Sequence, residues 1–136
     1  MIREVMHDPV FLARKSEEAT KADVQVATDL LDTLMANADK CVGMGANMIG
    51  ELKRIIAVND NGRYFIMYNP SIIDHGPSFT AEEGCLSLSG VRTCTRFRSI
   101  RVRYQDAKFR WKEKDYAGWT AQIIQHEIDH CNGILI

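Results

Sequence analysis

Residues 117–132, AGWTAQIIQHEIDHCN, are the stretch of this sequence that most constrains its fold. Apolar residues recur through it at helical spacing, and Gly133 follows where a helix would end. They lie on more than one side, which is typical of a buried helix; these residues are Trp119, Ala121, Ile123, Ile124 and Ile128. The segment also holds two histidines and two carboxylates, and buried polar groups need partners. We therefore expect a buried helix that carries a functional site.

The pattern HExxH lies within this helix, as HEIDH at residues 126–130. His126 and His130 are four residues apart, so both imidazoles lie on the same helix face. In this pattern the histidines bind a metal ion and the glutamate, here Glu127, acts as a general base. The alternative, two partly exposed histidines on a surface helix, fits poorly with the apolar surroundings. The helix is therefore predicted to contribute to a metal site.

The third metal ligand has to come from another part of the chain. In proteases with the pattern HExxHxxGxxH it is a downstream histidine, but here the pattern continues only through Gly133, and Ile136 is the last residue. We therefore expect an upstream ligand, among His7, His75, Cys41, Cys85 and Cys94. Cys85 is the best placed, because it lies in the tight, glycine-containing segment 83–87, EGCLS. A thiolate with two imidazoles also leaves a coordination position open for water.

Length and charge limit the class of protein. The 136 residues suit a single domain over residues 1–136, and 17 basic against 18 acidic side chains give a net charge of −1. This charge gives no reason to expect direct binding to nucleic acid or to a membrane surface. The chain shows no secretory signal and no run of roughly 20 apolar residues that could span a bilayer. We therefore expect a cytoplasmic protein with free thiols, in which Cys41, Cys94 and Cys131 are small buried hydrophobes.

Both helices and strands are predicted along the chain. A helix is expected over residues 24–39, with Asp23 as its cap, and the last helix over residues 117–132. Strands are predicted at residues 52–58 and 64–68, joined by a turn at Asn61-Gly62, and a second hairpin is predicted from residues 100–104 and 109–116. The remainder is expected to be irregular: the first 22 residues, the small-residue segments 41–50 and 82–90, and a loop marked by Pro70 and Pro77 with a short extended piece between them.

Two motifs in combination resemble the peptide deformylase family, whose members remove the N-formyl group from nascent bacterial proteins. They are EGCLS at residues 83–87 and QHEIDH at residues 125–130, and their order and separation also fit. Residues 7–14, HDPVFLAR, and the glycine-rich residues 43–50 are similar to further segments of that family. The resemblance implies an α+β fold with antiparallel strands packed around a central C-terminal helix that carries HExxH.

The resemblance also implies a set of site residues. Cys85, His126 and His130 would hold ferrous iron, for which zinc, nickel or cobalt can substitute. Glu127 would take a proton from metal-bound water and pass it to the leaving amine, and the backbone N–H of Leu86 would stabilise the developing oxyanion.

For the substrate, the resemblance implies Gly43 and position 48 in the first motif and Arg92 as a contact for the peptide chain. Alternatively, Arg92 is a solvated strand-end charge like Arg96, Arg98, Arg101 and Arg103. The pocket for the methionine side chain has three candidates by position, namely Val42, Gln122 and Ile123. Asp129 is expected to orient a ligand or to cap a neighbouring group.

Position 48 departs from the family pattern. The family's first motif ends in a glutamine that donates a hydrogen bond toward the substrate oxygen, and Met48 stands there in this chain. A thioether cannot donate, and loss of one oxyanion donor typically costs on the order of 10²–10³ in kcat. The adjacent Asn47 is a poor substitute, because neighbouring side chains generally point elsewhere.

Two functional hypotheses follow. The first is a metal-dependent hydrolase that acts on N-formylmethionyl peptides, with transient ribosome contact. The second, motivated by Met48, is a deformylase-like metal-binding protein of low or no activity that binds peptide N-termini or another partner such as the ribosome. A purely structural metal site fits poorly, because such sites usually have four protein ligands and would have no use for Glu127.

Overall fold

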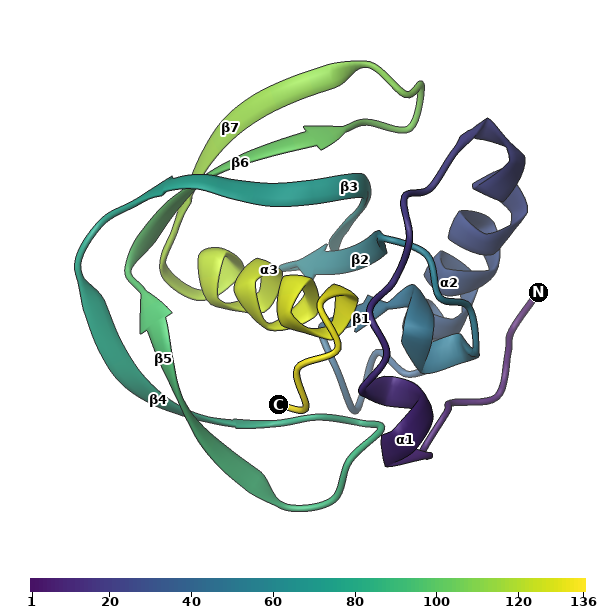
Figure 1. Ribbon diagram of the computed structural model, residues 1–136, viewed down its shortest axis with the longest axis horizontal. Coiled ribbons are helices and arrows are strands. Elements are labelled where there is room, and N and C mark those ends of the chain that lie inside the picture. Colours follow the sequence, from purple (N-terminus) through teal and green to yellow (C-terminus); the bar gives the residue numbers. More distant parts are fainter.

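The computed structural model describes residues 1–136 and places the last helix at the centre of the molecule (Figure 1). The α-helices are α1 (Pro9–Leu12), α2 (Val24–Ala36) and α3 (Gly118–Cys131), and the 3-10 helices are η1 (Lys21–Asp23) and η2 (Ala46–Ile49). The strands are β1 (Gly43–Gly45), β2 (Ile55–Asp60), β3 (Arg63–His75), β4 (Ser78–Gly84), β5 (Val91–Phe97), β6 (Ser99–Gln105) and β7 (Trp111–Ala117).

The strands form two antiparallel sheets. One has the order β1-β2-β3-β6-β7, and the other is the two-stranded hairpin β4-β5. Helix α3 lies between the larger sheet and the β4–β5 hairpin, and α2 lies beside β1 and β2 (Figure 1). Antiparallel strands thus surround a C-terminal helix that carries HExxH, which confirms the predicted α+β fold class.

Strand β2 is buried on both faces. Its first four residues, 55–58, form an uninterrupted apolar run, and each is fully buried. Ile55 and Ala57 belong to the core cluster that α2 covers. Ile56 and Val58 belong to the cluster that packs against α3. At this strand the sheet therefore lies between the two long helices, and the packing of Ile56 and Val58 sets where α3 lies on the sheet.

The predicted hairpin turns are confirmed. Asn61 and Gly62 both have positive φ, 52° and 90°, as a two-residue turn between twisted strands requires. They connect β2 to β3, with Asp60 paired to Arg63. Strands β6 and β7 also pair as predicted, from Ser99 opposite Ala117 to Gln105 opposite Trp111.

Strand β3 is longer than the sequence predicts. It continues through Pro70, where a loop was expected, because the register with β6 shifts between Tyr68 and Ser71. Proline lacks the N–H that a regular ladder needs, and a register shift removes that requirement. The β4–β5 hairpin was not predicted at all, and residues 78–97 form it around the loop 85–90.

The helices differ from expectation at three points. The supposedly irregular N-terminus contains the short helix α1, capped by the Asp8 side chain. The Asp23 carboxylate accepts from the Thr20 N–H and so completes η1, and it makes no cap bond to α2. Trp119 is 60% exposed rather than buried, because it lies in the first turn of α3 at the rim of a cleft.

None of the helices has the length and apolar character needed to cross a membrane.

The end of α3 packs tightly against the N-terminal segment at Gly133. This glycine has a φ of +74°, and a Cβ built on it would lie 2.5 Å from the Ala13 carbonyl oxygen. The Ser16 N–H donates to the Cys131 carbonyl close by, at 2.9 Å. Gly133 thus ends the helix and also admits the N-terminal backbone.

We expect Gly133→Ala to destabilise the fold by about 3 kcal/mol, because a backbone clash adds to the cost of positive φ. The matched control is Gly62→Ala, since Gly62 also has positive φ but open space around it, and about 1 kcal/mol is expected there. Chemical denaturation of both variants measures the difference. Equal losses would show that residues 13–14 move away at little cost.

Candidate metal centre

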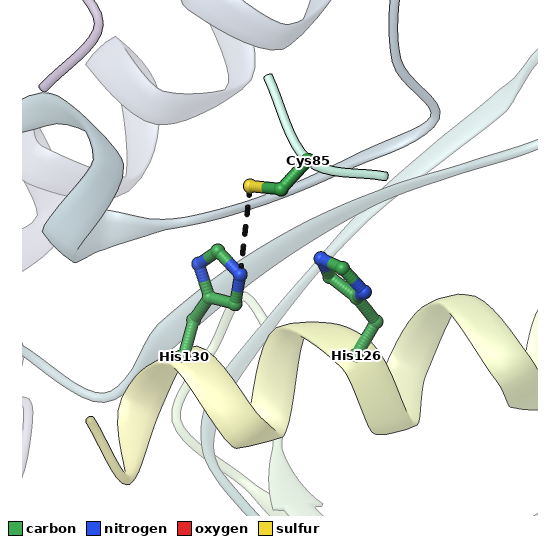
Figure 2. A group of neighbouring side chains, drawn as sticks. All are labelled: Cys85, His126 and His130. Carbon is green, nitrogen blue, oxygen red and sulfur yellow. Dashed lines mark hydrogen bonds between the residues drawn. The ribbon is translucent and has the colours of Figure 1, made fainter. Parts of the chain in front are cut away.

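Three side chains converge beside the C-terminal half of α3. His126 and His130 project from the helix toward Cys85, which lies on the loop 85–90 after β4 (Figure 2). Their ligand atoms all lie within 4.8 Å of one another, and Cys85 Sγ is 3.6 Å from His130 Nε2. The other upstream candidates, His7, His75, Cys41 and Cys94, are not part of this cluster. The structure therefore brings together the three ligands expected from the sequence.

A carboxylate orients one of these imidazoles. His126 Nδ1 lies 2.8 Å from Glu83 Oε1, and a carboxylate oxygen accepts, so the proton is on Nδ1. Nε2 is therefore the ring nitrogen of His126 that faces away from Glu83 and could bind a metal ion in place of a proton. A histidine ligand whose other nitrogen donates to a carboxylate is the usual outer arrangement of metal sites.

A buried guanidinium holds that carboxylate in place. Arg96, only 4% exposed, donates from Nε to both oxygens of Glu83 and from Nη2 to Oε1, at 2.8–3.1 Å. Its Nη1 donates to Asp129 on α3 at 2.6 Å. Burial opposes the charge on Glu83, but the hydrogen bonds from its partners keep its pKa well below its usual range. Asp129 thus caps a neighbouring group, as expected.

The burial of Arg96 corrects the interpretation of the sequence, in which this residue was one of several solvated strand-end charges. Neither Arg96 nor Glu83 was predicted to have a role. Glu83 had a signal, since it opens the EGCLS motif. Arg96 had none, because its burial depends on the unpredicted β4–β5 hairpin, where it lies on β5.

The electrostatics of the cluster favour a bound cation. Burial and the neighbouring His126 lower the pKa of His130 to about 4, so this imidazole is neutral at neutral pH. Burial alone would lower the pKa of His126, but hydrogen bonding to Cys85 and the negative charges of Glu127 and Glu83 raise it to about 10. A positive charge is thus stabilised between the side chains. One thiolate and two imidazoles are also ligands that divalent transition metals favour, so the residues fit such an ion.

Glu127 lies beside the cluster without a polar partner. It is 4% exposed, its Oε1 makes no hydrogen bond, and burial raises its pKa to about 7. The backbone of β1 passes over it, since a Cβ on Gly43 would lie 2.9 Å from Glu127 Oε2. An unpaired buried carboxylate oxygen is costly, and a pKa near the working pH suits a general base.

A cleft of about 600 Å³ leads to these groups. It includes most of the predicted substrate residues, and its walls are formed in part by Val42, Gly43, Met48, Leu86, Gln122 and Ile123. The Leu86 N–H donates to no protein group and is free to bind a ligand. Arg92 does not line the cleft, and its Nη1 donates to the Ser89 carbonyl at 3.3 Å.

The cysteines only partly match expectation. Cys131 is buried, as predicted. Cys41 and Cys94 are only partly buried, and Cys41 lines the cleft, which corrects the expectation of three core residues. Burial raises the pKa of the Cys41 thiol to about 11, so it is protonated at neutral pH.

Met48 is turned toward the backbone of its own segment. Its side chain is 1% exposed, and Sδ accepts from the Gly45 N–H at 3.4 Å. Asn47 donates from Nδ2 to the His130 carbonyl at 3.1 Å and does not line the cleft. Asn47 therefore braces α3 and does not replace the missing side-chain donor.

Comparison with known proteins places the chain in a family. The polypeptide deformylase family model matches residues 2–136. A peptide deformylase of Clostridium beijerinckii is 48% identical over 136 residues, with all of both chains covered. One from Dictyoglomus thermophilum is 36% identical, with 100% of this chain and 91% of the relative covered.

Solved structures agree with this assignment. The peptide deformylase of Thermotoga maritima has a TM-score of 0.88 at 27% identity, covering 99% of this chain and 95% of that one. A Met-Ala-Ser-bound peptide deformylase from Acinetobacter baumannii has a TM-score of 0.88 at 25% identity, covering 99% and 97%. The chain belongs to the peptide deformylase family. It is thus a hydrolase of a metal-dependent family, and membership implies N-terminal deformylation.

We expect Glu83→Gln to weaken metal binding by about 10- to 100-fold, because Arg96 and His126 lose the charge that orders them. Competition between the protein and a chelator for Zn²⁺ measures this. The matched control is Glu82→Gln, at an exposed position next along the same strand. Equal Zn²⁺ affinity in the two variants would show that Glu83 does not support the metal ligands.

Proposed function

We propose that this chain, as one catalytic domain over residues 1–136, removes the N-formyl group from the N-terminal methionine of nascent polypeptides. The observation that carries the proposal is the unpartnered carboxylate of Glu127 beside the cluster of one thiolate and two imidazoles. A general base next to three protein ligands is the arrangement of a catalytic metal site rather than of a structural one. Membership in the peptide deformylase family supports the reaction.

The metal-binding residues are Cys85, His126 and His130. We propose that they hold one divalent ion, Fe²⁺, for which Zn²⁺, Ni²⁺ or Co²⁺ can substitute. Such an ion, when bound, supplies a Lewis acid that polarises the formyl carbonyl and makes water more acidic. Glu83 and Arg96 keep His126 in the tautomer that binds it.

Two groups of the chain act on the reacting atoms. Glu127 takes a proton from the water that attacks the formyl carbon and then gives it to the leaving amine nitrogen. The free N–H of Leu86 donates to the formyl oxygen as negative charge develops there. Breakage of the carbon–nitrogen bond then leaves formate and a peptide with a free amino terminus.

The cleft walls bind the peptide. Val42 and Ile123 offer apolar surface to a methionine side chain, with Gln122 as a polar neighbour. Gly43 brings its backbone next to Glu127, and the buried Met48 also lines the cleft. Arg92, on β5 just beyond the loop 85–90, is proposed to contact the peptide chain outside the cleft. The Met-Ala-Ser complex of the A. baumannii relative supports a peptide ligand. We also propose a cytoplasmic location and transient ribosome contact.

One observation favours a second candidate function. Because Met48 cannot donate and Asn47 points to the His130 carbonyl, the cleft lacks a side-chain donor at the first-motif position. A protein with the metal site but a weakened oxyanion site would bind peptide N-termini and turn them over slowly.

The two candidates differ in one measurement. Protein prepared anaerobically with Fe²⁺ should deformylate formyl-Met-Ala-Ser, and Glu127→Gln should be slower by about 10²–10⁴-fold, since it loses the general base. Iron content, measured in parallel, should be equal in both proteins. A parent rate no higher than that of Glu127→Gln would leave peptide binding as the function.

We expect Met48→Gln to raise kcat by about tenfold or more, because it restores a donor toward the substrate oxygen. Met48→Leu is the control, since leucine keeps the volume and also lacks a donor, and its rate should stay near that of the parent. Steady-state assays of the three proteins give the comparison. A lower or unchanged rate in Met48→Gln would mean that position 48 does not face the reacting oxygen.

A further inference from the structure

The loop 85–90 has few anchors for a segment that carries two site residues. It provides Cys85 and the Leu86 N–H, yet strand pairing stops on either side of it, at Gly84 and Val91. Within the loop the Leu88 N–H donates to the Cys85 carbonyl, and the hydroxyl of Ser87 is buried without a partner. Cys85 and Leu86 also pack against the core cluster that α2 covers. Such apolar contacts do little to fix the orientation of the loop backbone.

Only two hydrogen-bonding contacts join this loop to residues outside its own hairpin. One is the Cys85 Sγ contact with His130 Nε2. The other comes from His7, whose Nδ1 lies 2.9 Å from the Ser87 carbonyl oxygen. A carbonyl oxygen only accepts, so Nδ1 of His7 carries the proton and donates. This contact spans 80 residues of sequence and, apart from the Cys85–His130 contact, is the only hydrogen bond from the loop to residues outside the β4–β5 hairpin.

His7 belongs to a strap, residues 6–8, that is fixed on both sides. The Met6 N–H donates at 2.7 Å to the carbonyl of Met48, a residue that also lines the cleft. The Asp8 side chain accepts from the Val10 N–H and starts α1, which the buried Leu12 anchors to the core. One short segment thus contacts the backbone of two chain segments that contribute to the cleft, through Met48 and through Ser87.

We propose that His7 is a positioning residue that sets the loop 85–90 over the cleft and thereby the direction of the Leu86 N–H. The proposal rests on the proposed function, because it assigns the consequence to the deformylation step. A shift of about 1 Å in a reacting geometry costs up to 100-fold in rate, so one support of such a loop has a measurable effect. His7 is exposed, so replacing it leaves the core intact.

The test compares His7→Ala, which removes the donor, with His7→Asn, whose side-chain N–H₂ can reach the same carbonyl. The control is His75→Ala, at another exposed histidine, which stacks on Phe97 and contacts the carbonyl of its neighbour Gly76. We expect His7→Ala to lower kcat on formyl-Met-Ala-Ser by about three- to tenfold with little change in KM. His7→Asn should recover most of the loss, and His75→Ala should match the parent.

Hydrogen exchange supplies a readout independent of activity. The amides of residues 85–90 should exchange faster in His7→Ala than in the parent, and those of α3 should not change. Unchanged exchange in the loop overturns the proposal, as does faster exchange in an active enzyme whose kcat is unaffected. If the parent is no faster than Glu127→Gln, the proposed function fails instead, and loop exchange alone decides whether His7 positions the loop.

Discussion

The buried guanidinium of Arg96 holds the β4–β5 hairpin against α3. It pairs with Glu83 on the facing strand and with Asp129 on the helix, so three elements meet at one side chain. Burying these charges is costly, and the cost is offset only while every partner stays in place. Because Glu83 also orients His126, the same interaction that closes the hairpin prepares a metal ligand. Closure of the β4–β5 hairpin against α3 and orientation of His126 therefore depend on the same ion-pair network.

The elements that were predicted correctly are those with local determinants. The apolar run 55–58, the Asn61-Gly62 turn and the helical spacing of α3 each have a cause within a few residues of sequence. The β4–β5 hairpin lacks such a cause, since its residues alternate between exposed and partly buried and its pairing depends on contacts with α3. Strand β3 continues through Pro70 for a similar reason, because the register shift that admits the proline involves a distant strand.

The candidate site shows the same division. HExxH is a local pattern, and Cys85 was indicated by its place in the tight, glycine-containing segment EGCLS. Burial of Arg96 could not be predicted, because a charge on a strand looks the same in sequence whether it faces water or a carboxylate. The prediction for Trp119 was wrong in the opposite direction. Its apolar side chain was expected to be buried, but it lies near the start of the helix at the rim of the cleft. The orphaned oxygen of Glu127 is likewise visible only in three dimensions.

The close approach of β1 to α3 has a consequence for how this chain can vary. A methyl group at position 43 would lie 2.7 Å from Cγ2 of Ile123 and 2.9 Å from the Glu127 carboxylate. Strand β1 and helix α3 therefore share one small volume, which the side chains of Ile123 and Glu127 fill from the helix side. Among related sequences, any residue larger than glycine at position 43 should coincide with a smaller one at position 123. The pocket can therefore diverge only through paired substitutions, so that position 43 of the first motif and position 123 of the helix should vary together.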